Sequence, residues 1–147
     1  MKKTIIVLFC IFLAIIISLY AYYLNSQNIL NSVKKFNYQF EQYFDKEFFG
    51  AEVATILNKA IDNNDRYEIP KTDKGKYIED NAYCLKILIK FKDVDDFFEM
   101  ESINSKGIEN FVKNFNMSTF KITDYKYNEK TKRIGKIVIE EIKIGNI

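Results

Sequence analysis

The sequence predicts an α+β fold in which a long N-terminal helix precedes a small head that contains a β-sheet. Three observations lead to this prediction. Residues 4–24 form an almost unbroken apolar run, and neither Gly nor Pro occurs before Gly50. Residues 83–92 alternate apolar and charged side chains with the period of a strand. Residues 118–127 and 133–144 flank a polar turn and are typical of a hairpin. We therefore expect a small antiparallel sheet of three to four strands packed against helices.

Residues 4–24 have the length and composition of a membrane-spanning helix. At about 1.5 Å per residue these 21 positions span roughly 31 Å, close to the hydrocarbon thickness of a bilayer. Between Ile5 and Leu19, twelve residues are Ile, Leu, Val or Phe, which favours insertion by roughly 4–7 kcal/mol. A core helix of a soluble protein rarely stays apolar on every face for this length. We predict that residues 4–24 lie in the lipid bilayer.

The flanking charges predict the orientation of this segment. Lys2 and Lys3 precede it, whereas the nearest basic residues after it are Lys34 and Lys35. Because positive charge near a membrane helix favours the cytoplasmic side, residues 1–3 are expected in the cytoplasm. Residues 25–147 are then extracytoplasmic.

A cleaved signal peptide is the alternative for the same segment. Cleavage after Ala21 would place the bulky Leu19 at position −3, where a small residue is needed. Lipoprotein processing is disfavoured by Phe9 directly before Cys10. We expect the segment to be retained as an anchor.

Residues 25–49 continue the helical pattern beyond the membrane. Their apolar residues are spaced three or four apart, at Ile29, Val33, Phe36, Phe40 and Tyr43. We therefore predict one continuous helix over residues 4–44 or beyond, with residues 25–49 as a stalk. Its apolar stripe is expected to pack on the head formed by residues 50–147, and a coiled-coil or filament contact with another chain is the alternative.

The first part of the head is predicted from its helix signals. Gly50 suits a helix end or a sharp bend. Residues 51–63 follow with one apolar face and with Glu52 in the first turn. The run Asn63-Asn64-Asp65 is expected to end this helix. Residues 65–81, which contain the only Pro, are expected to form a polar loop.

The remaining elements are predicted from periodicity. The charged face of the strand at residues 83–92 suggests a sheet with one wet side, and hence antiparallel pairing. Residues 97–103 are ambiguous. Ser105 is expected to cap a short helix with apolar residues at 108, 111, 112 and 115. In the two strands of the hairpin, the apolar residues change from odd to even positions or the reverse, between Ile122 and Tyr125 and again between Ile139 and Ile142. Such a shift in parity predicts β-bulges.

Composition excludes several classes of function. Beyond Leu24 there are 20 acidic and 20 of the 22 basic residues, so this part is neutral and does not favour nucleic-acid binding. The chain has no His, which rules out Ser–His and Cys–His nucleophiles within it. Cys10 would lie in the membrane and Cys84 in the extracytoplasmic head, so the two could not form a disulfide. Cys84 is expected to be a packed strand residue. We predict no catalytic residue, no cofactor and no metal.

Two acidic clusters are the only candidate cation sites. The first contains Asp93, Asp95, Asp96, Glu99 and Glu101. Carboxylates of this kind can bind Ca²⁺, but the spacing of an EF-hand loop is missing.

The second cluster comprises Asp62, Asn64 and Asp65, and the neighbouring Arg66 would repel a cation. Solvated or capping roles are favoured for both clusters. The charged strand residues Asp124, Glu140 and Glu141 are expected to be ordinary solvated surface.

The layout resembles type IV pilins and pseudopilins, in which an N-terminal apolar helix runs into a small α+β head. The prepilin motif is absent, because no Gly precedes position 50 and no acidic residue precedes Glu41. Residues 36–64, with Phe40-Glu41-Gln42-Tyr43 and Gly50-Ala51-Glu52-Val53, also resemble a group of short anchored proteins of Gram-positive bacteria. This resemblance implies a membrane-anchored architecture and no particular chemistry.

These observations predict a non-enzymatic, single-pass bacterial membrane protein whose outward head binds a protein partner or another copy of itself. A pilus-like or secretion assembly is the expected setting. A ligand-sensing domain is the alternative. A hydrolase that uses Asp93, Asp95 and Asp96 is the least favoured reading.

Overall fold

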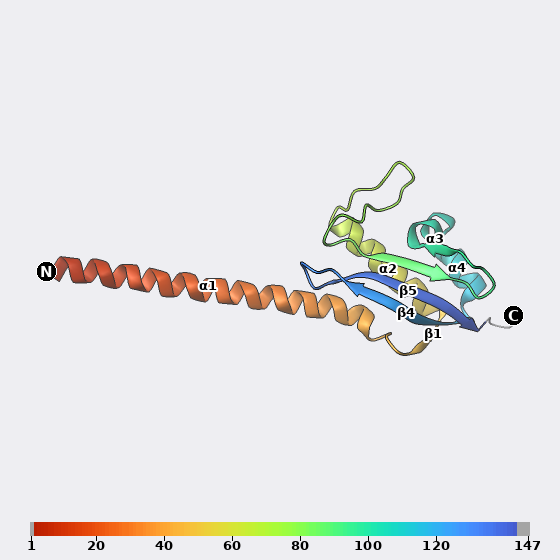
Figure 1. Ribbon diagram of the computed structural model, residues 1–147, viewed down its shortest axis with the longest axis horizontal. Helices are drawn as coiled ribbons and strands as arrows, with labels where there is room; N and C mark the ends of the chain where they lie inside the picture. The colour runs from red at the N-terminus through yellow and green to blue at the C-terminus, as the bar shows by residue number, and fades with distance from the viewer. Residues whose placement is uncertain (1, 144–147) are drawn as a thin grey trace. The chain divides into compact units, whose positions relative to one another are not determined.

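The computed structural model describes residues 2–143 and confirms the predicted α+β class (Figure 1). In chain order the elements are α1 (Lys2–Glu41), β1 (Glu47–Phe49), α2 (Gly50–Arg66), β2 (Lys86–Lys90), β3 (Phe97–Glu99), α3 (Met100–Lys106), α4 (Ile108–Phe115), β4 (Thr119–Tyr127) and β5 (Ile134–Lys143). The chain divides into two compact units between Phe36 and Asn37. The second unit, called the head below, contains the sheet and helices α2 to α4.

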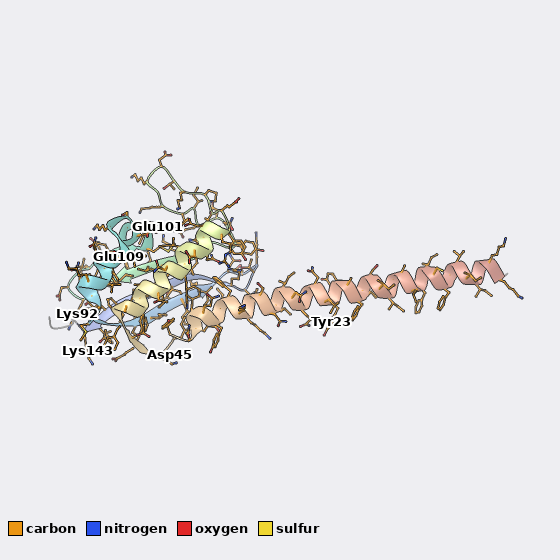
Figure 2. The ribbon with its side chains drawn as sticks, turned by 180° about the vertical axis from the view of Figure 1, so that it is seen from behind. Tyr23, Asp45, Lys92, Glu101, Glu109 and Lys143 are labelled. Atoms are coloured by element: carbon orange, nitrogen blue, oxygen red, sulfur yellow. The ribbon has the colours of Figure 1, made fainter. Side chains whose placement is uncertain are left out.

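Helix α1 carries the predicted apolar segment. It is long and apolar enough to cross a membrane, and the side chains of its apolar stretch are exposed, as Phe12 and Leu19 illustrate. Figure 2 labels Tyr23 near the end of that stretch.

The end of α1 corrects the predicted helical stalk. The helix ends at Glu41, not at residue 44 or in the range up to 49. Its last turn tightens, since the Tyr43 amide donates to the Phe40 carbonyl at 2.9 Å, and Asp45 then adopts a φ of 57°. Asp tolerates this left-handed conformation better than most residues. Residues 47–49 pair with β4, so sheet pairing overrides the helical pattern.

The sheet has five strands in the order β1-β4-β5-β2-β3 and is mixed. The sheet has slightly more strands than the predicted three to four, and its pairing is not antiparallel throughout, because β2 pairs with β5 in parallel. Parallel neighbours need a long crossover, and β3, α3, α4 and β4 supply it between these strands. Helices α2 and α3 contact β2, and the opposite side of this strand remains partly exposed, which explains its alternating pattern. A solvent-exposed face on one side of the strand is therefore compatible with both parallel and antiparallel pairing, and it could not distinguish them.

Both predicted parity shifts in the hairpin are β-bulges. The register of β4 and β5 shifts between Ile122 and Asp124, and again where Thr119 pairs with Lys143 but Phe120 with Glu141. Strand β5 is the central strand of the sheet. Accordingly, its Ile137 and Ile139 are fully buried and Val138 is nearly so. The last residue of the predicted strand, Ile144, lies outside the described residues.

Three predicted helix boundaries need correction. Gly50 begins α2 instead of ending a helix, and α2 continues through the predicted stop at Asn63-Asn64-Asp65 to Arg66. Ser105 lies inside α3, where its hydroxyl donates to the Ser102 carbonyl, so it caps nothing. Gly107, with a φ of 90°, separates α3 from α4. The apolar pattern predicted for the short helix, at residues 108, 111, 112 and 115, matches α4.

The core of the head lies between the sheet and its helices. Its largest fully buried side chains include Phe40, Ile56, Leu57, Leu85, Ile87, Ile89, Met100, Phe120, Ile137 and Ile139. The end of α1 also contributes polar contacts. The Asn37 side chain accepts from the Ile134 amide at 3.0 Å and donates to the Lys132 carbonyl at 2.9 Å. Residues 37–41 of α1 are therefore part of the head.

Candidate functional site

The first acidic cluster divides into two groups that play different roles. Glu99 and Glu101 hold the loop between α2 and β2. Glu99 lies 2.5 Å from the Lys76 ammonium and 3.6 Å from that of Lys86. Glu101 accepts from the Tyr77 amide at 3.0 Å. Each carboxylate therefore has a contact within the chain, although Glu101 Oε2 has no hydrogen-bond partner among the described residues.

The other three residues of this cluster do not form a cation site. Asp95 and Asp96 are exposed, and Asp93 lines a cavity described below. Within residues 2–143, no group of three or more acidic, His or Cys side chains is arranged to hold a metal ion.

The second acidic cluster is also dispersed. Asn64 is fully buried and bonds to the backbone of Leu85. Asp65 accepts from the Tyr77 hydroxyl at 2.7 Å and pairs with Lys71 at 3.1 Å. The Tyr77 hydrogen bond, more than Lys71, lowers the pKa of Asp65. Both residues therefore serve structural roles.

Cys84 lies just before β2 and is buried, consistent with the predicted packed residue. Burial, with a smaller contribution from Glu101 and Glu79, raises the pKa of its thiol to about 11. The thiol is therefore protonated near neutral pH, and a thiol is a poor nucleophile.

The Glu99 ion pairs lead to a prediction about pH. Lys76, more than Lys86, lowers the pKa of Glu99 below its ordinary value of 4.5. Because the folded-state pKa is the lower one, the stabilisation is complete above pH 4.5 and is lost as the pH falls through the folded-state value. Glu99→Gln should therefore reduce stability by roughly 0.5–1 kcal/mol at pH 7, since Lys76 is half exposed, and the difference should vanish in acid.

Urea unfolding of both proteins between pH 7 and pH 3 checks this prediction. Asp96→Asn is the matched control, because it removes the same charge from an exposed loop residue. A Glu99→Gln deficit that stays constant down to pH 3 would contradict the ion-pair assignment.

A further polar cluster lies at the C-terminal end of α2. The Arg133 guanidinium is buried and donates to the Asn63 side chain at 2.6 Å and to the Tyr67 hydroxyl at 2.9 Å. It also lies over the rings of Tyr67 and Tyr83, which stack on each other at 4.6 Å. These contacts join the end of α2, the loop between α2 and β2, and the start of β5. We assign them a structural role.

The head contains a cavity of about 430 Å³. It lies between the segment after β2, helices α3 and α4, and the end of β5. Figure 2 labels Lys92, Glu101 and Glu109, which mark the end of β2 and the two helices. The surface of its walls is mainly apolar, and four of the lining residues are aromatic, namely Phe91, Phe98, Phe111 and Phe115. A volume of this size is in the range of about 300–1,000 Å³ that small-molecule sites have.

Glu141 supplies the main buried charge of this cavity. It is only 7% exposed, although the alternation of charges predicted solvated surface at this position. Its Oε2 accepts from the Lys92 amide at 3.3 Å. Its Oε1 has no hydrogen-bond partner among the residues that the structure describes. The expectation of an exposed Glu141 is therefore wrong, whereas Asp124 is exposed and Glu140 is half-buried.

Part of this site could be predicted from the sequence. The aromatic residues of α4 were expected on one apolar face, and the strand at 133–144 was expected to shift its parity. The prediction missed that Glu141 lies on the same side of β5 as Ile137 and Ile139. Period-2 alternation from those two buried residues identifies Glu141 as the next inward position.

Comparison with protein-family models, with curated proteins and with solved structures found no match to this chain. The candidate site is therefore argued from its own residues.

Proposed function

We propose that this chain is a single-pass membrane protein with a cytoplasmic N-terminus and an outward, non-catalytic head that binds other proteins. The pilin-like layout favours a role within a pilus-like or secretion assembly. The observation that carries the proposal is helix α1. Its apolar stretch is exposed on all sides, whereas Asn37 and Phe40, near the end of the same helix, are buried in the head.

The exposed apolar surface supports the anchor. Large apolar side chains from Ile5 to Leu24 are between 44% and 73% exposed, and apolar patches of that extent indicate contact with lipid or protein. Lys2 and Lys3 favour a cytoplasmic N-terminus. The sequence contains no His, so Ser–His and Cys–His nucleophiles cannot form within it, which favours a binding role.

The anchor makes a prediction about membrane retention. The full-length chain should stay in the membrane pellet after an alkaline carbonate wash, because its apolar segment favours lipid by several kcal/mol, roughly 4–7. Trypsin added to protoplasts should cleave at Lys74, which is exposed in the loop between α2 and β2.

A chain that lacks residues 2–24 is the control and should appear in the soluble fraction. Release of the full-length chain by carbonate would contradict the anchor. A mature N-terminus beyond Ala21 would contradict it as well, and protection of Lys74 in protoplasts would reverse the orientation.

Crosslinking in intact cells tests the binding role. An amine-reactive reagent should join the head to another protein or to a second copy, and the same treatment after detergent extraction at high dilution is the control. A product that stays monomeric in cells would count against an assembly component.

Ligand binding by the head is a second candidate function. The observation that favours it is the aromatic cavity with Glu141 in its wall. The two functions are compatible, since an anchored head can bind a small molecule and a protein. The experiment that tests ligand binding is given with the inference below.

A further inference from the structure

The aromatic side chains around the cavity form a connected group. Phe91 stacks on Phe115 with a centroid distance of 4.6 Å and meets Phe98 edge-on at 5.2 Å. Phe111 stacks on Phe115 at 5.1 Å. Phe91, Phe98 and Phe115 are only partly buried, so their rings contribute open surface to the cavity. The negative faces of such rings attract organic cations.

The charge of the cavity also favours a cation. Glu141 and Asp93 both line it, and Lys106 is the basic residue among the lining side chains. The Lys106 ammonium lies 5.9 Å from the centroid of Phe98 and forms no described ion pair with Glu141. The cavity therefore carries one more negative charge than positive charge.

Glu141 is the residue that needs a partner. Burial of a carboxylate is unfavourable unless charges or hydrogen bonds compensate for it. The Lys92 amide provides one long hydrogen bond to Oε2, and Oε1 has none among the described residues. Oε1 lies below the cavity surface, but the last torsion of a Glu side chain is soft. A small rotation would therefore present Oε1 to a bound donor.

We infer that this cavity binds a small organic ammonium ion, meaning an amine carried on an apolar body. The ammonium group donates to Glu141, and the apolar body lies among Phe91, Phe98 and Phe115. An anion is disfavoured because Glu141 and Asp93 would repel it. This inference deepens the second candidate function and rests on it, since it names the class of ligand that the head binds.

Three probes that share one apolar body test the ligand class. They are 2-phenylethylammonium, neutral 2-phenylethanol and anionic phenylacetate, each titrated calorimetrically into the full chain in lipid nanodiscs. The ammonium probe should bind about tenfold or more tightly than the alcohol, because a charge-assisted hydrogen bond is stronger than a neutral one. Phenylacetate should bind more weakly than either.

Variants assign the effect to one carboxylate. Glu141→Gln keeps the size of the side chain and should remove the preference for the ammonium probe while leaving 2-phenylethanol binding unchanged. Glu140→Gln is the matched control, because Glu140 is the adjacent residue of β5 and does not line the cavity. It should retain the full preference. Phe98→Ala should weaken the binding of all three probes.

The outcomes distinguish the ammonium ligand class from ligand binding by the head in general. Equal binding of the three probes, or an unchanged preference in Glu141→Gln, would overturn the ammonium class and leave ligand binding in place. Binding of none of them would overturn both. Thermal unfolding of each variant checks that the head is folded, and a Glu141→Gln protein that unfolds early can be replaced by Glu141→Met in the same titration.

Discussion

Replacing Gly50 with alanine is expected to destabilise the head by about 3 kcal/mol or more, a large effect for a single methyl group. Gly50 is the first residue of α2, and the helix begins against the end of α4. A Cβ at this position would lie 2.0 Å from the carbonyl oxygen of Phe115 and 2.6 Å from its carbonyl carbon. Both are backbone atoms, so a rotamer change cannot relieve the contact.

The neighbouring backbone is also fixed on the other side. The Gly50 amide donates to the Ser118 carbonyl at 3.1 Å, and the Ser118 amide donates to the Phe115 carbonyl at 3.0 Å. Moving α2 away from Phe115 would therefore break the link between α2 and the start of β4. Helix propensity predicts the opposite sign, because Ala is favoured over Gly by about 1 kcal/mol in a helix interior. The sign of the measured change thus decides between close packing and propensity.

Thermal unfolding of the full chain in detergent, followed by near-ultraviolet circular dichroism, measures this change. A loss of 3 kcal/mol should lower the Tm of a domain of this size by roughly 10–20 °C. Gly135→Ala is the control, because a Cβ there meets no atom closer than 3.8 Å. An unchanged or raised Tm in Gly50→Ala would contradict the close approach of α2 and α4.

Gly50 also shows where sequence analysis of this chain reaches its limit. Periodicity is a local property, and it correctly predicted the apolar helix, the aromatic face of α4 and the bulged hairpin. Strand β2 and the residue before it follow the predicted alternation, with Leu85, Ile87 and Ile89 buried. Gly50 was interpreted from local rules as a helix end or a bend. Its actual role depends on Phe115, which is 65 positions away and enters no local pattern.

Sheet order was beyond prediction for the same reason. The parallel pair of β2 and β5 joins Ile87 to Ile137 and Ile89 to Ile139. Each strand presents the alternation that an antiparallel neighbour would also produce. The short edge strands β1 and β3, with three residues each, carry too few positions for any period to be recognised.

The candidate site was only partly predictable. Its aromatic residues follow from the apolar face of α4, and Asp93 was among the acidic residues considered. Glu141 was interpreted as surface because it follows Glu140 and precedes Lys143 in a charged stretch. Alternation from the buried Ile137 and Ile139 instead places it on the inward side, opposite the buried Phe120 of β4.

The pair Asn63-Asn64 was likewise interpreted as a helix stop, although both residues lie inside α2 and are buried. Asn favours helix ends because its side chain competes for backbone hydrogen bonds. Here the side chains bond to the backbone of another segment. The Asn64 amide group accepts from the Leu85 amide at 2.9 Å and donates to the Leu85 carbonyl at 2.8 Å. It thereby pairs with the residue just before β2 as a neighbouring strand would.

Asn64→Ala is therefore expected to destabilise the head by about 3–5 kcal/mol. Asn64 is fully buried, so the substitution leaves the amide and the carbonyl of Leu85 without their partner in a site that water cannot easily reach. Each unsatisfied buried group costs about 1–3 kcal/mol, and the lost side-chain volume adds a cavity. Urea unfolding of the full chain in detergent gives the free energy, and hydrogen exchange at the Leu85 amide reports the lost bond directly.

Two further variants distinguish this bond from a general effect of changing α2. Asn58→Ala alters an exposed Asn on the same helix and should be neutral or stabilise slightly, since Ala has the higher helix propensity. Asn64→Asp keeps the acceptor for the Leu85 amide but places a carboxylate against the Leu85 carbonyl, so it should destabilise at pH 7 and recover in part in acid. If Asn64→Ala lost no more stability than Asn58→Ala, the side chain of Asn64 would not be what holds α2 to the start of β2.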